Sequence, residues 1–149
     1  MKKVNSSLAA LALALAVWAI ASVQAEDNHE GDTGHILAGY LAVADALYKD
    51  DLDAAQKAAL FIDAHDADST LSAPAKKLAE AANITGAREA FQKLSAKAIE
   101  MANHQEGEKY TVMNCSIVNG GKGDWLSSDR KVNHPYFGAK MPHCGGPKK

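Results

Sequence analysis

The sequence lacks an excess of basic charge, and this absence argues against a nucleic-acid-binding protein. Its 149 residues hold 16 Lys and Arg against 18 Asp and Glu, a formal net charge of −2. A nucleic-acid-binding domain normally carries a basic excess. Glycine is also scarce, with 11 residues in no regular period, which excludes a fibrous protein. Because 47% of the residues are hydrophobic and 23% are charged, length and composition predict one globular domain.

The motifs that mark common enzyme active sites are absent as well. The sequence has no Ser-His-Asp set, no H-E-x-x-H and no glycine-rich loop that leads into a helix. His143 and Cys144 are adjacent in sequence, and immediate neighbours seldom meet side chain to side chain as base and nucleophile. We therefore expect a protein that is not an enzyme.

Long hydrophobic runs are missing except at the N-terminus. Leu8–Ile20 is uncharged, follows two lysines and precedes Val23 and Ala25, small residues at the positions that signal peptidase recognises. The run is shorter than the roughly 20 residues of a bilayer span. We predict a signal peptide over residues 1–25, with an uncleaved anchor as the alternative. No cysteine follows the run, which excludes a lipid-modified N-terminal cysteine.

Cleavage after Ala25 leaves a mature chain with no second long apolar run, so we expect no membrane insertion. Both cysteines remain in this exported chain and face an oxidising compartment. Residues 26–34 are acidic and polar, and we expect them to form a flexible leader.

Hydrophobic spacing predicts helices over about residues 35–104. Apolar residues recur in steps of three and four, which places them on one face of each helix. We expect Asp50 and Thr85 to cap the second and fourth helices and a short third helix to begin near Ser72. Four short amphipathic helices joined by short links predict a mostly α fold, an up-and-down four-helix bundle.

The helical period ends after Gly107, and residues from about 108 to 146 form an irregular C-terminal segment. Three aromatic residues in it, Trp125, Tyr136 and Phe137, are expected to form a small second core that holds this segment against the bundle. The segment also concentrates sulfur and imidazole groups: Met113, Cys115, His134, Met141, His143 and Cys144.

These side chains predict a metal site, because thiolate and thioether donors select Cu(I) over hard cations. Cys115, Met141 and Cys144 suffice as ligands, and His143 can complete the site. The alternative is a Cys115–Cys144 disulfide, the usual state of two cysteines in a small exported domain. The two states exclude each other, because the sulfurs of a disulfide are poor ligands compared with thiolates. Met113 has the further alternative of simple core packing.

Several segments, in their order along the chain, resemble the DUF3347 family. The resemblance covers about residues 35–146 and includes an "R-x-x-F-x-x-L-S" helix. The segments are Arg88 to Ser95, Met113-Asn114-Cys115, Gly123-Asp124-Trp125-Leu126, Pro135-Tyr136-Phe137-Gly138 and Met141-Pro142-His143-Cys144-Gly145. The resemblance implies a helical bundle with a metal-related C-terminal motif. Such domains occur alone as exported proteins and fused to copper- or heavy-metal-efflux membrane-fusion adaptors.

By this resemblance the protein is a periplasmic soft-metal-binding protein, and an efflux adaptor is its implied partner. Copper is the implied ion, with Cu(I) favoured and Zn, Ag or Hg as further possibilities. The chain departs from the family at Cys115-Ser116-Ile117, where the family typically reads Cys-Pro-Met, and at His134, where it typically reads Asn. His134 and His143 can replace the lost thioether, which shifts the preference towards Cu(II) or Zn. The alternative function is a metal-free interaction module held by the Cys115–Cys144 disulfide.

Overall fold

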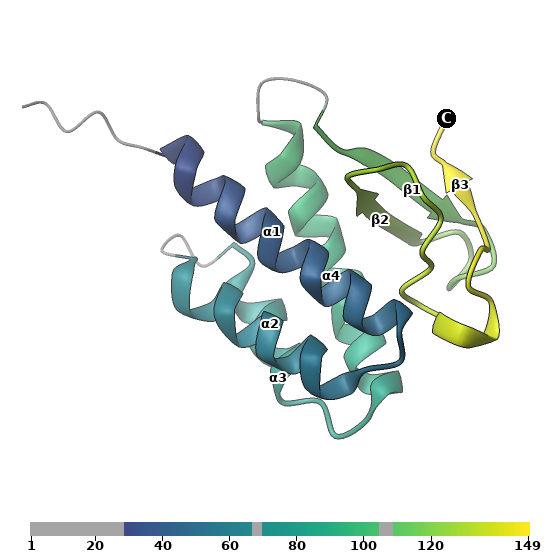
Figure 1. Ribbon diagram of the computed structural model, residues 1–149, viewed down its shortest axis with the longest axis horizontal. Helices are drawn as coiled ribbons and strands as arrows, with labels where there is room; N and C mark the ends of the chain where they lie inside the picture. The colour runs from purple at the N-terminus through teal and green to yellow at the C-terminus, as the bar shows by residue number, and fades with distance from the viewer. Residues whose placement is uncertain (1–28, 67–69, 105–108) are drawn as a thin grey trace, which may run out of the picture.

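We describe the structure from a computed structural model, in which the described residues are 29–66, 70–104 and 109–149. Four helices precede a small sheet, as Figure 1 shows. The elements are α1 (His29–Tyr48), α2 (Leu52–His65), α3 (Ser72–Ala79), α4 (Ile84–Asn103), β1 (Thr111–Cys115), β2 (Gly123–Ser127), the 3-10 helix η1 (Gly138–Lys140) and β3 (Gly146–Pro147). The signal peptide predicted over 1–25, and residues 26–28 of the predicted leader, lie outside the described residues.

The four predicted helices are confirmed, with differences at their ends. α1 begins at His29, earlier than the start expected near residue 35, so residues 29–34 of the predicted leader are helical. No proline falls between residues 29 and 48 to force a later start. The cap of α2 is Asp51, whose carboxylate accepts from the Ala54 N–H, and the cap of α4 is Asn83, which accepts from the Gly86 N–H.

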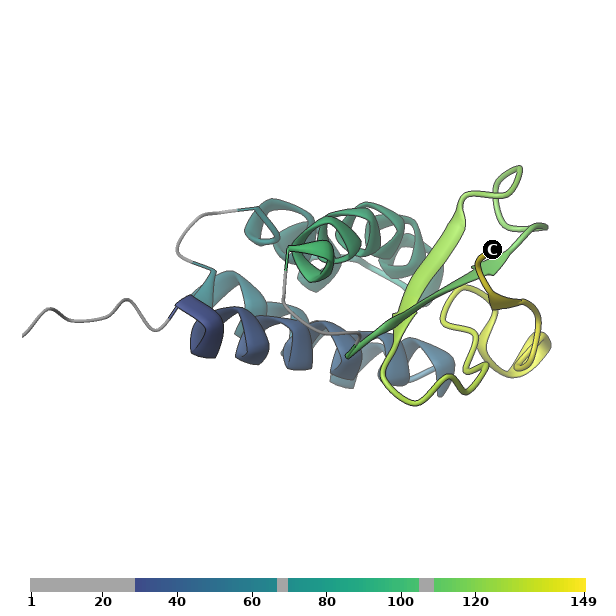
Figure 2. The ribbon, with the colours of Figure 1, turned by 90° about the horizontal axis from the view of Figure 1, so that it is seen from above.

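The helices pack in two layers, with α1 and α2 in one and α3 and α4 in the other (Figure 2). Large side chains from α1 and α4, such as Leu37, Leu47, Phe91 and Leu94, are fully buried between them. The helix faces that meet also carry many alanines, which lets the axes approach closely. Among the helices in the described part of the chain, none combines the length and apolar character needed to cross a bilayer.

The C-terminal segment is more regular than the sequence predicted, because it forms a three-stranded antiparallel sheet in the order β2-β1-β3. Figure 2 shows this sheet and η1 at one end of the helical layers. β1 pairs with β2 so that Met113 lies opposite Trp125 and Cys115 opposite Gly123. Residues alternate between the two faces of a strand, and Met113 and Cys115 are both buried on the same face of β1.

Buried hydrogen bonds join the sheet to the bundle. The Tyr40 hydroxyl lies 2.8 Å from the Ser95 hydroxyl and accepts from the Leu126 N–H, while Ser95 donates to the Asp124 carbonyl. Tyr136 donates to the same carbonyl at 2.6 Å. Burial raises the pKa of both tyrosines, so their hydroxyls keep the proton that these hydrogen bonds need. The predicted aromatic contact with the bundle is present, but it does not form a second core. Trp125 and Tyr136 belong to the same buried core as the helix side chains, and Phe137 packs against that core partly buried.

Candidate metal centre

The two cysteines meet although they are 29 positions apart in the sequence. Cys115 ends β1, and Cys144 lies just before β3, which pairs with β1 (Figure 1). Their sulfurs form a disulfide, with the two Cα atoms 6.0 Å apart. Cys115 is 1% exposed, whereas Cys144 is only partly buried. Of the two residues joined by the disulfide, Cys115 is therefore shielded from solvent, and Cys144 lies nearer the surface.

His134 completes a group of three with the cysteines. A ring nitrogen of His134 and the two sulfurs all lie within 4.8 Å of one another. The backbone N–H of His134 donates to the Pro142 carbonyl, and the backbone carbonyl of His134 accepts from the Gly138 N–H. The ring stacks on Phe137 and meets the Trp125 ring edge-on, with centroids 5.1 and 5.2 Å apart. Backbone and aromatic contacts thus fix the imidazole beside the sulfurs.

The environment of His134 favours its neutral form. Burial, together with the positive charge of Arg88, lowers the pKa of His134 from 6.5 to about 4. Its Nδ1 accepts a 3.0 Å hydrogen bond from the Phe137 N–H, so the proton of the neutral ring is on Nε2. Among the described residues, this Nε2 is the buried side-chain polar atom without a hydrogen-bond partner. The site therefore holds a desolvated N–H donor on a ring that adjoins two sulfurs.

Arg88 of α4 holds the segment that carries His134. Its guanidinium donates to the carbonyls of Leu47 and Pro135 and pairs with the Asp50 carboxylate. Asp50 also accepts from the Ala139 N–H, and these bonds lower the pKa of the Asp50 carboxyl. Sequence reasoning placed Arg88 in a helix motif and Asp50 at a cap but missed this shared role. The arginine of the "R-x-x-F-x-x-L-S" run, Arg88, was the feature of the sequence that could have indicated this role.

Gly138 offers a test of this anchor, because a Cβ there would collide with the Arg88 guanidinium and the Asp50 carboxylate. We expect Gly138→Ala to cost about 2–3 kcal/mol of unfolding free energy through this collision and its left-handed backbone at φ +51°. The matched control is Gly120→Ala, at φ +70° with open space around it, which should cost about 1 kcal/mol. Urea unfolding of both variants checks this. Equal losses would show that the anchor tolerates a methyl group.

The remaining predicted ligands occupy different surroundings. Met113 is fully buried on the Cys115 face of β1, and Met141 is 41% exposed. The side chain of His143 is exposed, and its Nδ1 lies 3.0 Å from the Val132 carbonyl, to which it can donate. His143 is not a member of the Cys115–His134–Cys144 group. The ligand roles of Met113, Met141 and His143 stay predictions.

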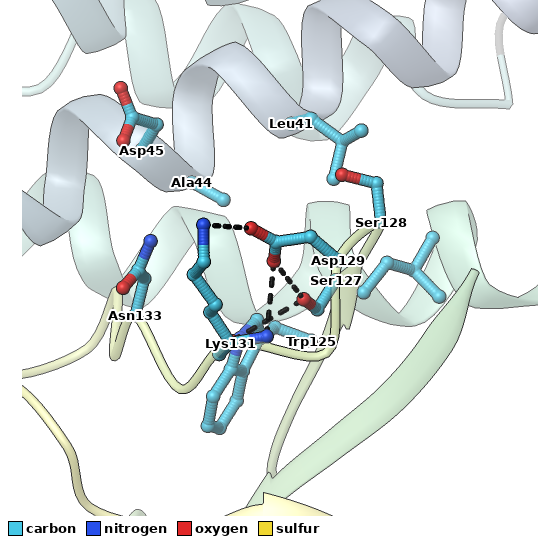
Figure 3. Close-up of a pocket in the computed structure, with 10 residues that line it drawn as sticks. Leu41, Ala44, Asp45, Trp125, Ser127, Ser128, Asp129, Lys131 and Asn133 are labelled. Atoms are coloured by element: carbon cyan, nitrogen blue, oxygen red, sulfur yellow. Dashed lines mark hydrogen bonds and ion pairs between the residues drawn. The ribbon is translucent and has the colours of Figure 1, made fainter.

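A polar cavity of about 190 Å³ lies on the α1 side of Trp125 (Figure 3). Its charged groups are largely satisfied by each other. Asp129 pairs with Lys131 and accepts from the Ser127 hydroxyl, and hydrogen bonds from Lys131 lower the pKa of Asp129. Asp45, which also lines the cavity, pairs with Lys49. This cavity therefore presents weaker ligand chemistry than the Cys-His group.

No protein-family model, curated protein or solved structure matches this chain. The fold and the site define a class, a mostly helical protein whose C-terminal part holds a Cys-His-Cys group that could bind a metal ion. In the structure two of its three donors are joined as a disulfide.

Proposed function

We propose that this chain is an exported protein that binds a soft metal ion, Cu(I), when Cys115 and Cys144 are reduced. The observation that carries the proposal is the convergence of both sulfurs and a His134 ring nitrogen within 4.8 Å of one another. In the disulfide form Nδ1 accepts from the Phe137 N–H and Nε2 carries the proton. His134 therefore joins the two thiolates as a ligand after the ring proton leaves the nitrogen that binds the ion. Thiolates are soft donors that select Cu(I), Zn and related ions over Mg, Ca or Mn.

The composition of the group favours Cu(I) over Zn. Structural zinc sites are almost always tetrahedral, with four ligands. Among the described His, Cys, Asp and Glu residues, the group around Cys115 has three members. Cu(I) accepts lower coordination, and Met113, on the same buried face of β1, adds a soft sulfur to that side of the strand. Trp125 and the core shield the Cys115 side of the site from water, which slows the oxidation of Cu(I) bound there.

The proposal also includes a periplasmic location and a protein partner. The N-terminal segment of residues 1–25 has the pattern of a signal peptide, which supports a periplasmic location. The resemblance to DUF3347, whose members also occur fused to metal-efflux adaptors, supports an efflux adaptor as the partner that receives or supplies the ion.

A Cu(I) competition titration of the reduced protein with a chromophoric chelator tests the proposal. We expect one Cu(I) per chain, no binding by the disulfide form, and affinity more than tenfold weaker in Cys115→Ser or Cys144→Ser, since each removes a thiolate. His65→Gln is the matched control, because His65 lies on α2 outside the group and should leave the affinity unchanged. Undetectable binding, or equal affinity in the cysteine variants, would refute the proposal.

The disulfide itself favours a second candidate function, a metal-free interaction module in which Cys115–Cys144 is a structural crosslink. A thiol assay on protein isolated from the periplasm separates the two functions. Free thiols that appear after growth in excess copper support metal binding. A disulfide that persists under those conditions supports the module.

A further inference from the structure

The two ends of the disulfide differ in access. Cys144 lines a surface cavity of about 440 Å³, together with residues such as Asn114, Ser116 and Gly121. Cys115 does not line that cavity and is 1% exposed. An attacking thiolate must reach the sulfur that it bonds to, so access decides which sulfur is attacked.

The buried end of the disulfide lies beside a hydrogen-bond donor. Exchange at Cys144 expels the other sulfur as a thiolate, which carries a negative charge in the buried interior. A buried charge is costly unless a donor satisfies it. The His134 ring adjoins both sulfurs, and its Nε2–H is the donor without a protein acceptor.

From this arrangement we propose that Cys115–Cys144 is a redox-active disulfide, opened by a dithiol that attacks Cys144, with Cys115 as the leaving thiolate and His134 Nε2–H as its hydrogen-bond donor. The cavity admits the reductant, and burial protects Cys115 from direct attack. Metal binding by the two reduced cysteines rests on the proposed function. The thiol–disulfide exchange is independent of that function.

The steps balance with a dithiol as the named reductant. Its first thiolate bonds to the Cys144 sulfur, the Cys144–Cys115 bond breaks, and the electron pair stays on the Cys115 sulfur. The second thiolate of the reductant then attacks the reductant's own sulfur in the mixed disulfide and releases Cys144 as a thiolate. The protein disulfide is reduced to two thiols, with protons taken from water, and the dithiol is oxidised to its disulfide.

The site of attack is tested on the unaltered oxidised protein, with a chelator present to exclude metals. Glutathione is added briefly, free thiols are alkylated, and mass spectrometry of peptides locates each modification. We expect glutathione on Cys144 and the alkyl group on Cys115, in at least about tenfold excess over the reverse, because only Cys144 borders the cavity. Equal labelling, or glutathione mainly on Cys115, would overturn the assignment.

The role of His134 is tested by the rate at which dithiothreitol reduces metal-free variants. His134→Leu removes the N–H and should slow reduction about tenfold, the worth of one hydrogen bond to a charged group. His134→Asn keeps an acceptor for the Phe137 N–H and a donor, and should stay within about threefold of the unaltered rate. Loss of folding would expose the disulfide and speed reduction, so a slower rate reports the lost donor. An unchanged or faster rate in His134→Leu would overturn the role.

These assays contain no metal, so their failure is separate from failure of the metal titration. A protein that binds Cu(I) after chemical reduction but reacts equally at both sulfurs would keep the proposed function and lose the directed exchange. A protein that reacts at Cys144 but binds no Cu(I) would keep the redox-active disulfide alone.

Discussion

Reduction of the Cys115–Cys144 disulfide in the metal-free protein is expected to lower the free energy of unfolding by about 3–4 kcal/mol, the loop-closure entropy of about 30 residues. The bond closes a loop with a sequence separation of 29, between the end of β1 and the segment before β3. β3 is only two residues long, so we expect its pairing with β1 to weaken when this crosslink opens. Thermal unfolding of oxidised and reduced protein should show a fall in Tm of about 10–15 °C.

Metal should reverse this loss if the opened site binds an ion. A ligand held by the folded state alone stabilises it by about 2.7 kcal/mol at a free concentration one hundred times its Kd. Cu(I) added to the reduced protein should therefore restore most of the lost Tm. The control is Cys115→Ala/Cys144→Ala, which should match the reduced protein and respond neither to reductant nor to Cu(I). A reduced protein as stable as the oxidised one would show that the disulfide carries no stability.

The helices could be predicted from the sequence because their information is local. The spacing of Phe91, Leu94 and Ala98 defines a buried face of α4 whatever the rest of the chain does. The prediction failed at the cap of α2, where Asp50 and Asp51 are equally suitable residues. Asp51 takes the cap, because Asp50 adopts φ 59° and holds Arg88 and the Ala139 N–H instead. That choice depends on a contact 89 positions away, which periodicity does not contain.

The sequence also shows which side chains could be donors of the candidate site, but it does not show which of them come together in the fold. Their composition does not distinguish His134 from His143. The structure distinguishes them through a backbone hydrogen bond. The backbone N–H of His134 donates to the Pro142 carbonyl and thereby holds the segment around His134 against the segment before Cys144. The pleat of β1 then directs Cys115 inward. Sequence spacing carries neither the fold-back of the C-terminal segment nor the burial of His134, because both arise from tertiary packing.

Burial of His134 should make the oxidised protein lose about 3 kcal/mol of unfolding free energy as the pH falls from 6.5 to 4, the free-energy equivalent of that pKa difference. The sign follows from the direction of the shift. The unfolded chain protonates His134 near its ordinary value of 6.5, whereas the folded protein resists protonation until about pH 4. Between these values the unfolded state binds more protons, so acid favours it, and the full stability is present above pH 6.5.

Urea unfolding of the oxidised protein across pH 4 to 7 measures this loss, and His134→Asn should flatten the curve because an amide does not titrate there. His65→Gln is again the control, since His65 is an exposed residue whose ring contacts Phe61 on the same helix. The carboxyl groups of Asp50 and Asp129, whose pKa values are lowered, lose their contributions at more acidic pH than this window. Parallel curves for His134→Asn and the unaltered protein would therefore show that His134 is not held neutral by the fold, and would remove the Nε2–H donor from the chemistry of the disulfide.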